Sequence, residues 1–156
     1  MKIYHLERVM PVPVSLREAF AFFEDPRNLA RITPPWLNFR ITSPEPIRMR
    51  RGAEFAYQIR WFGLPVNWRS VITEYEPPFF FEDEQAAGPY AHWRHRHDFK
   101  PSEYGALVSD EVEYALPFGL LGRLAHRVAV ERHLRQIFDY RQETLAAILT
   151  GAPTAK

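Results

Sequence analysis

The stretch GLLGRLAHRVAVERHLRQIFDYRQETLAAILT, residues Gly119–Thr150, decides the fold because it predicts one long helix. It contains no proline and no glycine after Gly122, and Gly151 stands where a helix C-cap glycine belongs. Its apolar residues fall on one side at helical spacing: Leu124, Val128, Leu134, Phe138, Leu145 and Leu149. A helix of about 45 Å needs a large apolar surface to pack against, which the rest of the chain must supply.

The N-terminal part of the chain predicts one strand and two short helices. The strand covers Lys2–Met10 and ends at Pro11, although its inward face is not clear from the sequence. Ser15 and Glu18 have the spacing of a capping box at the start of the first helix. A second short helix is expected over Arg27–Ile32.

From Leu37 onward, the hydrophobic period changes from helical to two. Alternation of apolar and polar residues predicts about six half-buried strands joined by short turns, hence an antiparallel meander. The strands lie near residues 37–42, 54–61, 66–72, 79–85, 92–100 and 108–114. The expected fold is α+β: a curved sheet of about six to seven strands that grips the long C-terminal helix. We expect a single domain over residues 1–150 and a disordered tail over 151–156.

Composition narrows the class of protein. The chain has 156 residues, of which 46% are hydrophobic and 15% aromatic, enough for one sizeable core. A net charge of +1 argues against nucleic acid as a partner, and the lack of cysteine excludes disulfides and thiolate metal sites. We see no signal peptide and no membrane-spanning segment, so we expect a cytoplasmic protein. No cofactor is predicted.

Five polar residues share the inward faces of three consecutive strands. By alternation these are Asp83 and Gln85, then His95 and His97, then Asp110. If these strands are neighbours, the five side chains converge on the concave face. Carboxylates beside imidazoles would relieve the cost of burying them, about 1–3 kcal/mol per unpaired group, and would raise the pKa of the histidines.

This cluster supports three readings. It could be a structural hydrogen-bond network, a polar anchor for a ligand, or an acid–base site in which His95 or His97 acts with Asp110. The candidate ligand-binding residues are Phe55, Tyr57, Ile59, Trp61, Trp68, Phe81, Asp83, Gln85, Trp93, His95, His97, Asp110, Val112, Tyr114, Phe138 and Arg141. The pair His95-x-His97 also has a spacing that some metal sites use, with Asp83 or Asp110 as a third ligand. We predict no metal, because no further histidine is clearly inward.

Other charged residues are interpreted as structural. Arg94, Arg96 and Lys100 lie on the outward face of one strand, where Glu82 and Glu84 could pair with them. The long helix begins with a basic face, interpreted as a solvated surface rather than a membrane or partner site: Arg123, Arg127, Arg132 and Arg135. Arg141 lies near the apolar stripe, and we favour a snorkelling side chain over one that reaches Asp110 or Glu131. Oligomeric state is open, since an edge strand or the basic face could mediate a homodimer.

Several stretches together resemble the START/polyketide cyclase-like superfamily, also called SRPBCC, over nearly the whole chain. They are Thr33-Pro34-Pro35-Trp36, Tyr75-Glu76-Pro77-Pro78, Phe81-x-Asp83-x-Gln85, Gly88-Pro89-Tyr90, Trp93-x-His95-x-His97-x-Phe99 and Asp110-x-Val112-x-Tyr114-x-Leu116-Pro117-Phe118-Gly119. The resemblance implies a helix-grip fold with a deep apolar cavity, but not one activity. We therefore expect binding of a lipid, polyketide or isoprenoid-like molecule. The alternatives are a cyclase or dehydratase and a protein–protein interaction module with a vestigial cavity.

Overall fold

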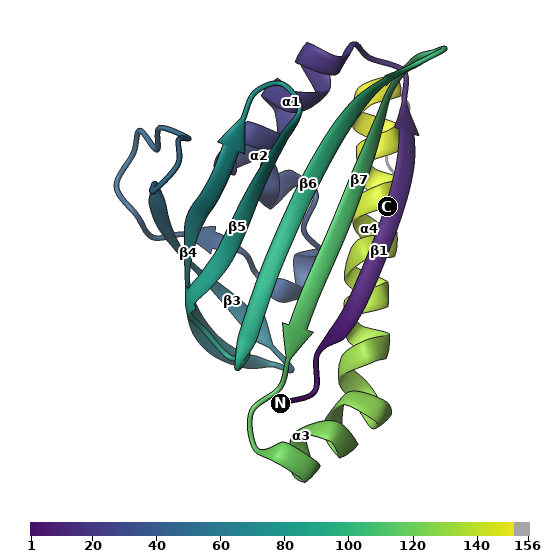
Figure 1. The fold of residues 1–156 in the computed structure, drawn as a ribbon. Coiled ribbons are helices and arrows are strands. Elements are labelled where there is room, and N and C mark those ends of the chain that lie inside the picture. The colour runs from purple at the N-terminus through teal and green to yellow at the C-terminus, as the bar shows by residue number, and fades with distance from the viewer. Residues whose placement is uncertain (152–156) are drawn as a thin grey trace.

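The computed structural model describes residues 1–151 and shows a curved sheet wrapped against one long helix (Figure 1). All neighbouring strands are antiparallel, in the order β1-β7-β6-β5-β4-β3-β2. The strands are β1 (Tyr4–Val12), β2 (Arg40–Ile41), β3 (Glu54–Trp61), β4 (Leu64–Glu76), β5 (Phe80–Ala87), β6 (His92–Ser102) and β7 (Gly105–Ala115). The predicted helix-grip fold is confirmed. Apart from Gly151, the predicted disordered tail lies outside the described residues.

Two short helices cover the concave side of the sheet beside the long helix (Figure 1). They are α1 (Leu16–Glu24) and α2 (Pro26–Arg31). The predicted capping box is present: the Glu18 amide donates to Ser15 Oγ at 3.2 Å, and the Ser15 amide donates to the Glu18 carboxylate at 2.9 Å. The second helix begins at Pro26, one residue before the predicted start, since proline is well suited to the first helical position.

The C-terminal helix is continuous but changes its winding. It consists of α3 (Gly119–Ala125), a π-helical turn (His126–Val130) and α4 (Glu131–Thr150), and it ends at Gly151 with φ of +70°. Leu134, Phe138 and Leu145 are buried as predicted, whereas the predictions for Leu124 and Val128 are wrong because both are mostly exposed. The π turn shifts the helical register, so a stripe read at constant spacing fails across it. Figure 1 shows α3 turned away from the line of α4.

Two strand boundaries also differ from the prediction. Strand β1 runs through Pro11 to Val12, because it is an edge strand paired only with β7, where a proline that lacks an N–H is tolerated. Its inward face, undecided from the sequence, carries the buried residues Met10 and Val12. The strand expected over residues 37–42 is reduced to Arg40–Ile41, since residues 35–37 form a 3-10 turn.

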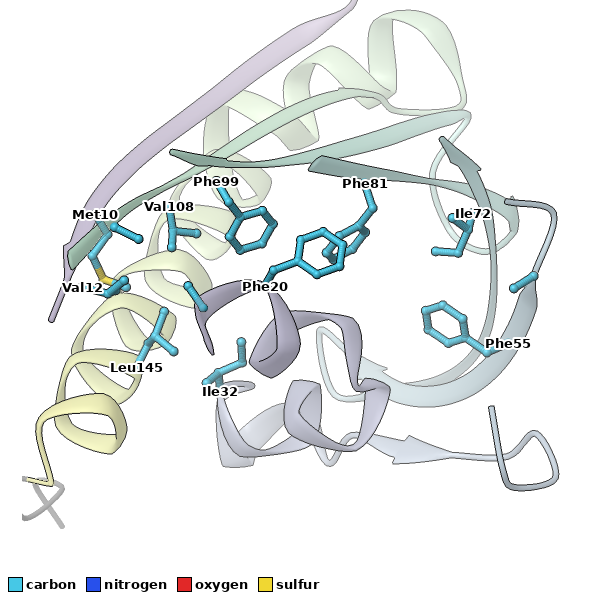
Figure 2. Packing of buried hydrophobic residues seen from close by; sticks show 13 residues of the cluster. Met10, Val12, Phe20, Ile32, Phe55, Ile72, Phe81, Phe99, Val108 and Leu145 are labelled. Carbon is cyan, nitrogen blue, oxygen red and sulfur yellow. The ribbon is translucent and has the colours of Figure 1, made fainter. Parts of the chain in front are cut away.

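The core lies between the concave face of the sheet and the three helices (Figure 2). The Phe20 ring of α1 packs edge-on against Phe81 and Phe99 of the sheet, with centroids 5.8 and 5.2 Å apart. Leu145 of α4 closes the same cluster beside Met10 of β1. A second cluster, toward the start of α4, is more aromatic and includes Trp68, Tyr90, Tyr114 and Phe138. Burial of these rings stabilises the packing of the helices against the sheet.

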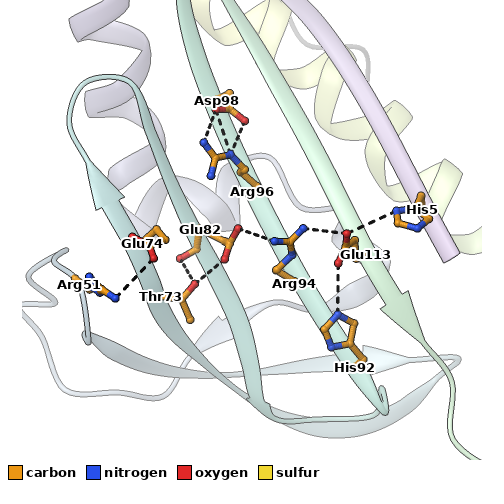
Figure 3. Close-up of polar contacts among 10 residues, drawn as sticks. All are labelled: His5, Arg51, Thr73, Glu74, Glu82, His92, Arg94, Arg96, Asp98 and Glu113. Carbon is orange, nitrogen blue, oxygen red and sulfur yellow. Dashed lines mark hydrogen bonds and ion pairs between the residues drawn. The ribbon is translucent and has the colours of Figure 1, made fainter. Parts of the chain in front are cut away.

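The convex face of the sheet carries paired charges, as predicted (Figure 3). Arg94 lies 3.4 Å from Glu82 and 2.9 Å from Glu113, and Arg96 pairs with Asp98 at 3.0 Å. Glu82 is nevertheless only 6% exposed, because Thr73 donates to it from the neighbouring strand and Arg94 covers it. Arg94 and Arg96 therefore each have a carboxylate partner, which fits a structural role.

Candidate functional site

The inward polar residues of β5, β6 and β7 form one buried network. In the sheet register Asp83 lies opposite His95, and His97 lies opposite Asp110. His95 Nε2 is 2.7 Å from Asp110 Oδ1, and His97 Nε2 is 3.2 Å from Asp83 Oδ2. The second ring nitrogen of His97, Nδ1, is 3.2 Å from Asp110 Oδ1. The predicted convergence of these four residues is therefore correct.

The long helix completes the network with a cation. Arg141 is buried and its Nη1 donates to Asp110 Oδ1 at 3.1 Å. The snorkelling interpretation of Arg141 is therefore wrong, because the guanidinium finds a charged partner inside the protein that offsets the cost of its burial. Burial alone would raise the pKa of Asp110, but the charge of Arg141, the hydrogen bond with His95 and the nearby ring of His97 hold it well below its usual value.

The two histidines have opposite protonation preferences although their ring centroids are only 3.8 Å apart. Burial, followed by the charge of His97, lowers the pKa of His95 to about 4. Burial also acts to lower the pKa of His97, but its contacts with Asp110 and Asp83 outweigh that effect and raise it. The predicted increase in histidine pKa is correct for His97 and wrong for His95. Protonation of His95 would bury a second positive charge beside that of His97, and the two charges would repel each other.

These preferences give the network a balanced charge. Arg141 and a protonated His97 oppose the carboxylates of Asp110 and Asp83. His95 is then neutral, and its partner Asp110 assigns the proton to Nε2. Its other nitrogen, Nδ1, keeps a free lone pair on a ring that lines the cavity described next.

A cavity of about 150 Å³ lies between the sheet and the helices, with the network in its wall. It is lined mostly by aromatic and aliphatic side chains. Of the predicted ligand-binding residues, those that line it are Phe55, Tyr57, Ile59, Trp61, Trp68, Phe81, Asp83, Trp93, His95, His97, Phe138 and Arg141. The combination of an apolar lining with a few polar groups is typical of small-molecule pockets.

Four predicted residues lie outside the lining. Asp110 sits behind the histidines, where it orients them. Gln85 is bonded to the backbone of Tyr90, donating to its carbonyl at 2.8 Å and accepting from its amide at 3.1 Å. Tyr114 is engaged by His126 at 2.8 Å, and Val112 is fully buried in the second core cluster. Alternation correctly gave these residues an inward face, but it does not say which inward residues border empty space.

Part of the cavity wall was missed by the sequence reasoning. The two short helices and the segment after them contribute Phe22, Phe23, Leu29, Ile32, Leu37, Phe39 and Met49, and the long helix adds His133, Leu134 and Ile137. The apolar residues Leu16, Ala19, Phe20 and Phe23 have helical spacing in the sequence, which indicates that this face is buried but not which residues it packs against. His133 also corrects the statement that no further histidine faces inward. Its Nε2 is buried with no hydrogen-bond partner among residues 1–151, and burial lowers its pKa.

Asp83, His95 and His97 are also the residues that could hold a metal ion, since one donor atom from each lies within 4.8 Å of the other two. A divalent ion there would displace the proton of His97 and leave the buried group with a net charge of about +1, counting Arg141 and both carboxylates. With the pKa of His97 raised, a proton there would already balance the charges, so the charge of the network favours a metal-free site although the three donor atoms are close enough for an ion.

Comparison with protein-family models decides the family. The model described as polyketide cyclase / dehydrase and lipid transport matches residues 12–138, most of the chain. The chain belongs to this family. The resemblance seen in the sequence motifs is thereby confirmed, and the match spans the strands that carry the buried network.

Solved structures support the same fold. Protein CV1439 from Chromobacterium violaceum aligns with a TM-score of 0.69 and 17% identity, covering 94% of this chain and 96% of that one. The di-domain ARO/CYC StfQ from the steffimycin biosynthetic pathway gives 0.72 and 14%, covering 96% of this chain and 51% of that one. Major latex-like protein 151 from Panax ginseng gives 0.69 and 10%, covering 94% and 97%. At these identities the likeness shows the fold alone. Comparison with curated proteins found no match.

Proposed function

We propose that this protein binds a compact apolar or aromatic small molecule in the cavity between the sheet and the long helix. The observation that carries the proposal is the cavity itself, aromatic over most of its wall and polar at the buried network. The family description, which joins polyketide cyclisation with lipid transport, supports a hydrophobic ligand in general.

The cavity volume favours a small ligand. An apolar space of about 150 Å³ is the size that accepts benzene in a protein core, whereas drug-sized pockets are at least twice as large. A ring system of this order fits without movement of the walls. A two-chain lipid would require the helices to separate from the sheet, which would cost burial of the core rings.

Two nitrogen atoms provide anchors for a polar group on the ligand. His95 Nδ1 can accept a hydrogen bond on one side of the cavity, and His133 Nε2 lacks a partner on the long helix. An unpartnered buried polar group costs about 1–3 kcal/mol, which a ligand hydroxyl or carbonyl would recover. We therefore propose a phenol-like or ketone-bearing ligand rather than a pure hydrocarbon.

The test begins with native mass spectrometry of the purified protein and identification of any molecule released by organic extraction. A thermal-shift series with naphthols, aromatic polyketide fragments and long-chain fatty acids then measures stabilisation. A ligand at about 100 times its Kd should contribute about 2.7 kcal/mol, or about 5–10 °C in Tm for a chain of this size.

A matched pair of variants makes that experiment specific. Ile137→Trp would fill the cavity from α4, whereas the neighbouring Gln136→Trp places the same ring in solvent. We expect only the first to abolish the ligand-induced shift. A shift that persists in Ile137→Trp, or the absence of any shift in the native protein, would refute binding in this cavity.

The enzyme alternative is supported by one specific observation: His95 lines the cavity with its Nε2 held by Asp110, and burial lowers its pKa. As general base, His95 could take a proton from the carbon beside a substrate carbonyl while Asp110 holds its ring. His97 is less suited to this role because each of its nitrogens faces a carboxylate. The amide oxygen of a glutamine can still accept a hydrogen bond from the ligand but is no general base. The variant His95→Gln should therefore lose turnover of an enolisable polyketide-like ketone and keep its ligand-induced thermal shift. Retained turnover would exclude this assignment.

The remaining expectations stay proposals. An interaction module with a vestigial cavity is disfavoured, because the cavity is present. Within residues 1–151 no helix combines the length and apolar character of a membrane span, as expected. The absence of a nucleic-acid partner, the cytoplasmic location and a homodimer are proposals that rest on the charge and surface pattern of the sequence.

A further inference from the structure

Helix α3 and the turns around it expose an unusual number of large apolar side chains. They are between 60% and 82% exposed: Phe118, Leu120, Leu121, Leu124 and Val128. Single exposed leucines need no explanation, but five within eleven consecutive residues form a contiguous apolar surface. We call these five residues the α3 patch. Exposure of this much apolar surface to water is unfavourable in free energy, which indicates that a partner covers it.

The charged residues within the sequence stretch of the α3 patch are arginines, and the nearest acidic residue after it is Glu131. Within α3, at about 100° per residue, Leu120, Leu121 and Leu124 fall within an arc of about 100°, and Arg123 lies about 60° from its edge. Val128 and Arg127 follow in the π turn. Residues 114–130 contain no aspartate or glutamate. The sequence alone led us to interpret the arginines as an ordinary solvated face, because Glu131 follows them and the chain is nearly neutral. The exposure of Leu124 and Val128 changes that interpretation.

The turn between β3 and β4 extends the apolar surface at the same end of the molecule. Its residues Phe62 and Leu64 are 45% and 67% exposed. Phe62 packs on His133 near the start of α4, with ring centroids 4.5 Å apart. Trp61 and His133, on either side of Phe62, both line the cavity. The apolar end of the molecule is therefore also one end of the cavity.

We propose that the α3 patch docks this protein on the surface of an anionic lipid bilayer, with the leucines in the acyl boundary and Arg123 and Arg127 at the headgroups. An exposed apolar helix face with arginines next to it is the pattern of interfacial membrane helices. A second copy of the chain fits less well, since a two-fold contact through α3 would bring the same arginines of both copies together. This inference goes beyond ligand binding and does not depend on it.

The experiment is co-sedimentation of the full chain with vesicles of phosphatidylcholine alone and with vesicles containing 30% phosphatidylglycerol. The native protein should partition onto the anionic vesicles and lose most of that binding in 0.5 M salt. Leu120→Ser with Leu124→Ser should lower the partition coefficient about tenfold or more. Arg123→Gln with Arg127→Gln should lower it about tenfold on anionic vesicles and leave the weak binding to neutral vesicles unchanged.

A matched control uses two apolar residues exposed at the far end of the sheet. Phe79→Ser with Tyr104→Ser removes similar exposed area from the β4–β5 and β6–β7 turns and should leave partition unchanged. Equal loss in this control would overturn the proposal, as would failure of the native protein to bind anionic vesicles. Light scattering of the same variants tests whether a second copy of the chain, rather than a bilayer, covers the α3 patch. A native dimer that the leucine changes convert to monomer, without vesicle binding, would assign the α3 patch to a second copy.

Discussion

Replacement of Arg141 by methionine tests whether the buried network stabilises the fold. Arg141 Nη1 lies 3.1 Å from Asp110 Oδ1, and each side chain is 10% exposed. Removal of one partner from a buried ion pair costs about 3–5 kcal/mol, because the other charge stays buried. Asp110 keeps its contacts with His95 and His97, so we expect the lower end of that range, about 3 kcal/mol. For a chain of this length Tm should fall by about 6–12 °C.

The assay is urea unfolding at pH 7 followed by tryptophan fluorescence, together with thermal unfolding by circular dichroism. Arg8→Met is the matched control, because Arg8 also joins a strand to α4, through Asp139 at 3.0 Å. That pair is exposed to 25% and 60%, so its loss should cost about 1 kcal/mol or less. If Arg141→Met costs no more than Arg8→Met, the guanidinium is solvated and our account of the network is wrong. Combining Arg141→Met with Asp110→Asn should cost less than the sum of the two.

Three further predictions concern pH, metal and helix placement. His95 has a pKa of about 4 in the folded state, below its unfolded value of about 6.5. The free energy of unfolding should therefore decline as the pH falls from 6.5 to 4. The variant His95→Gln should flatten that decline, measured as the urea midpoint at each pH. Calorimetric titration with Zn²⁺ should find no tight site, because the ion must displace the proton of His97. Stoichiometric binding of Zn²⁺ that is lost in Asp83→Asn would show that our assignment of charges in the network is wrong. Gly122→Ala should lower the free energy of unfolding by about 1–3 kcal/mol, because a Cβ would collide with the Pro117 carbonyl oxygen. A thermal unfolding curve with unchanged Tm would show instead that α3 can shift to make room.

The inward residues of the strands could be predicted because a strand has a period of two and one face of this sheet is buried. This is why Asp83, His95, His97 and Asp110 were placed together correctly. The same reasoning could not separate the cavity wall from the filled core. Tyr114 and Trp93 alternate in the same way, yet only Trp93 borders the cavity. That difference depends on what the helices place opposite each residue.

The sequence by itself determined the element order, the α+β class, the curved antiparallel sheet and the caps of its helices, because these depend on local periodicity, proline, glycine and capping residues. Only the tertiary structure decided that Arg141 turns inward, since its stabilising partner Asp110 is 31 residues away in the chain. It also decided the protonation of the two histidines, which is set by burial and by charges from three strands and a helix. The exposure of α3 was decided in the same way, because one π turn over residues 126–130 rotates its leucines out of the core.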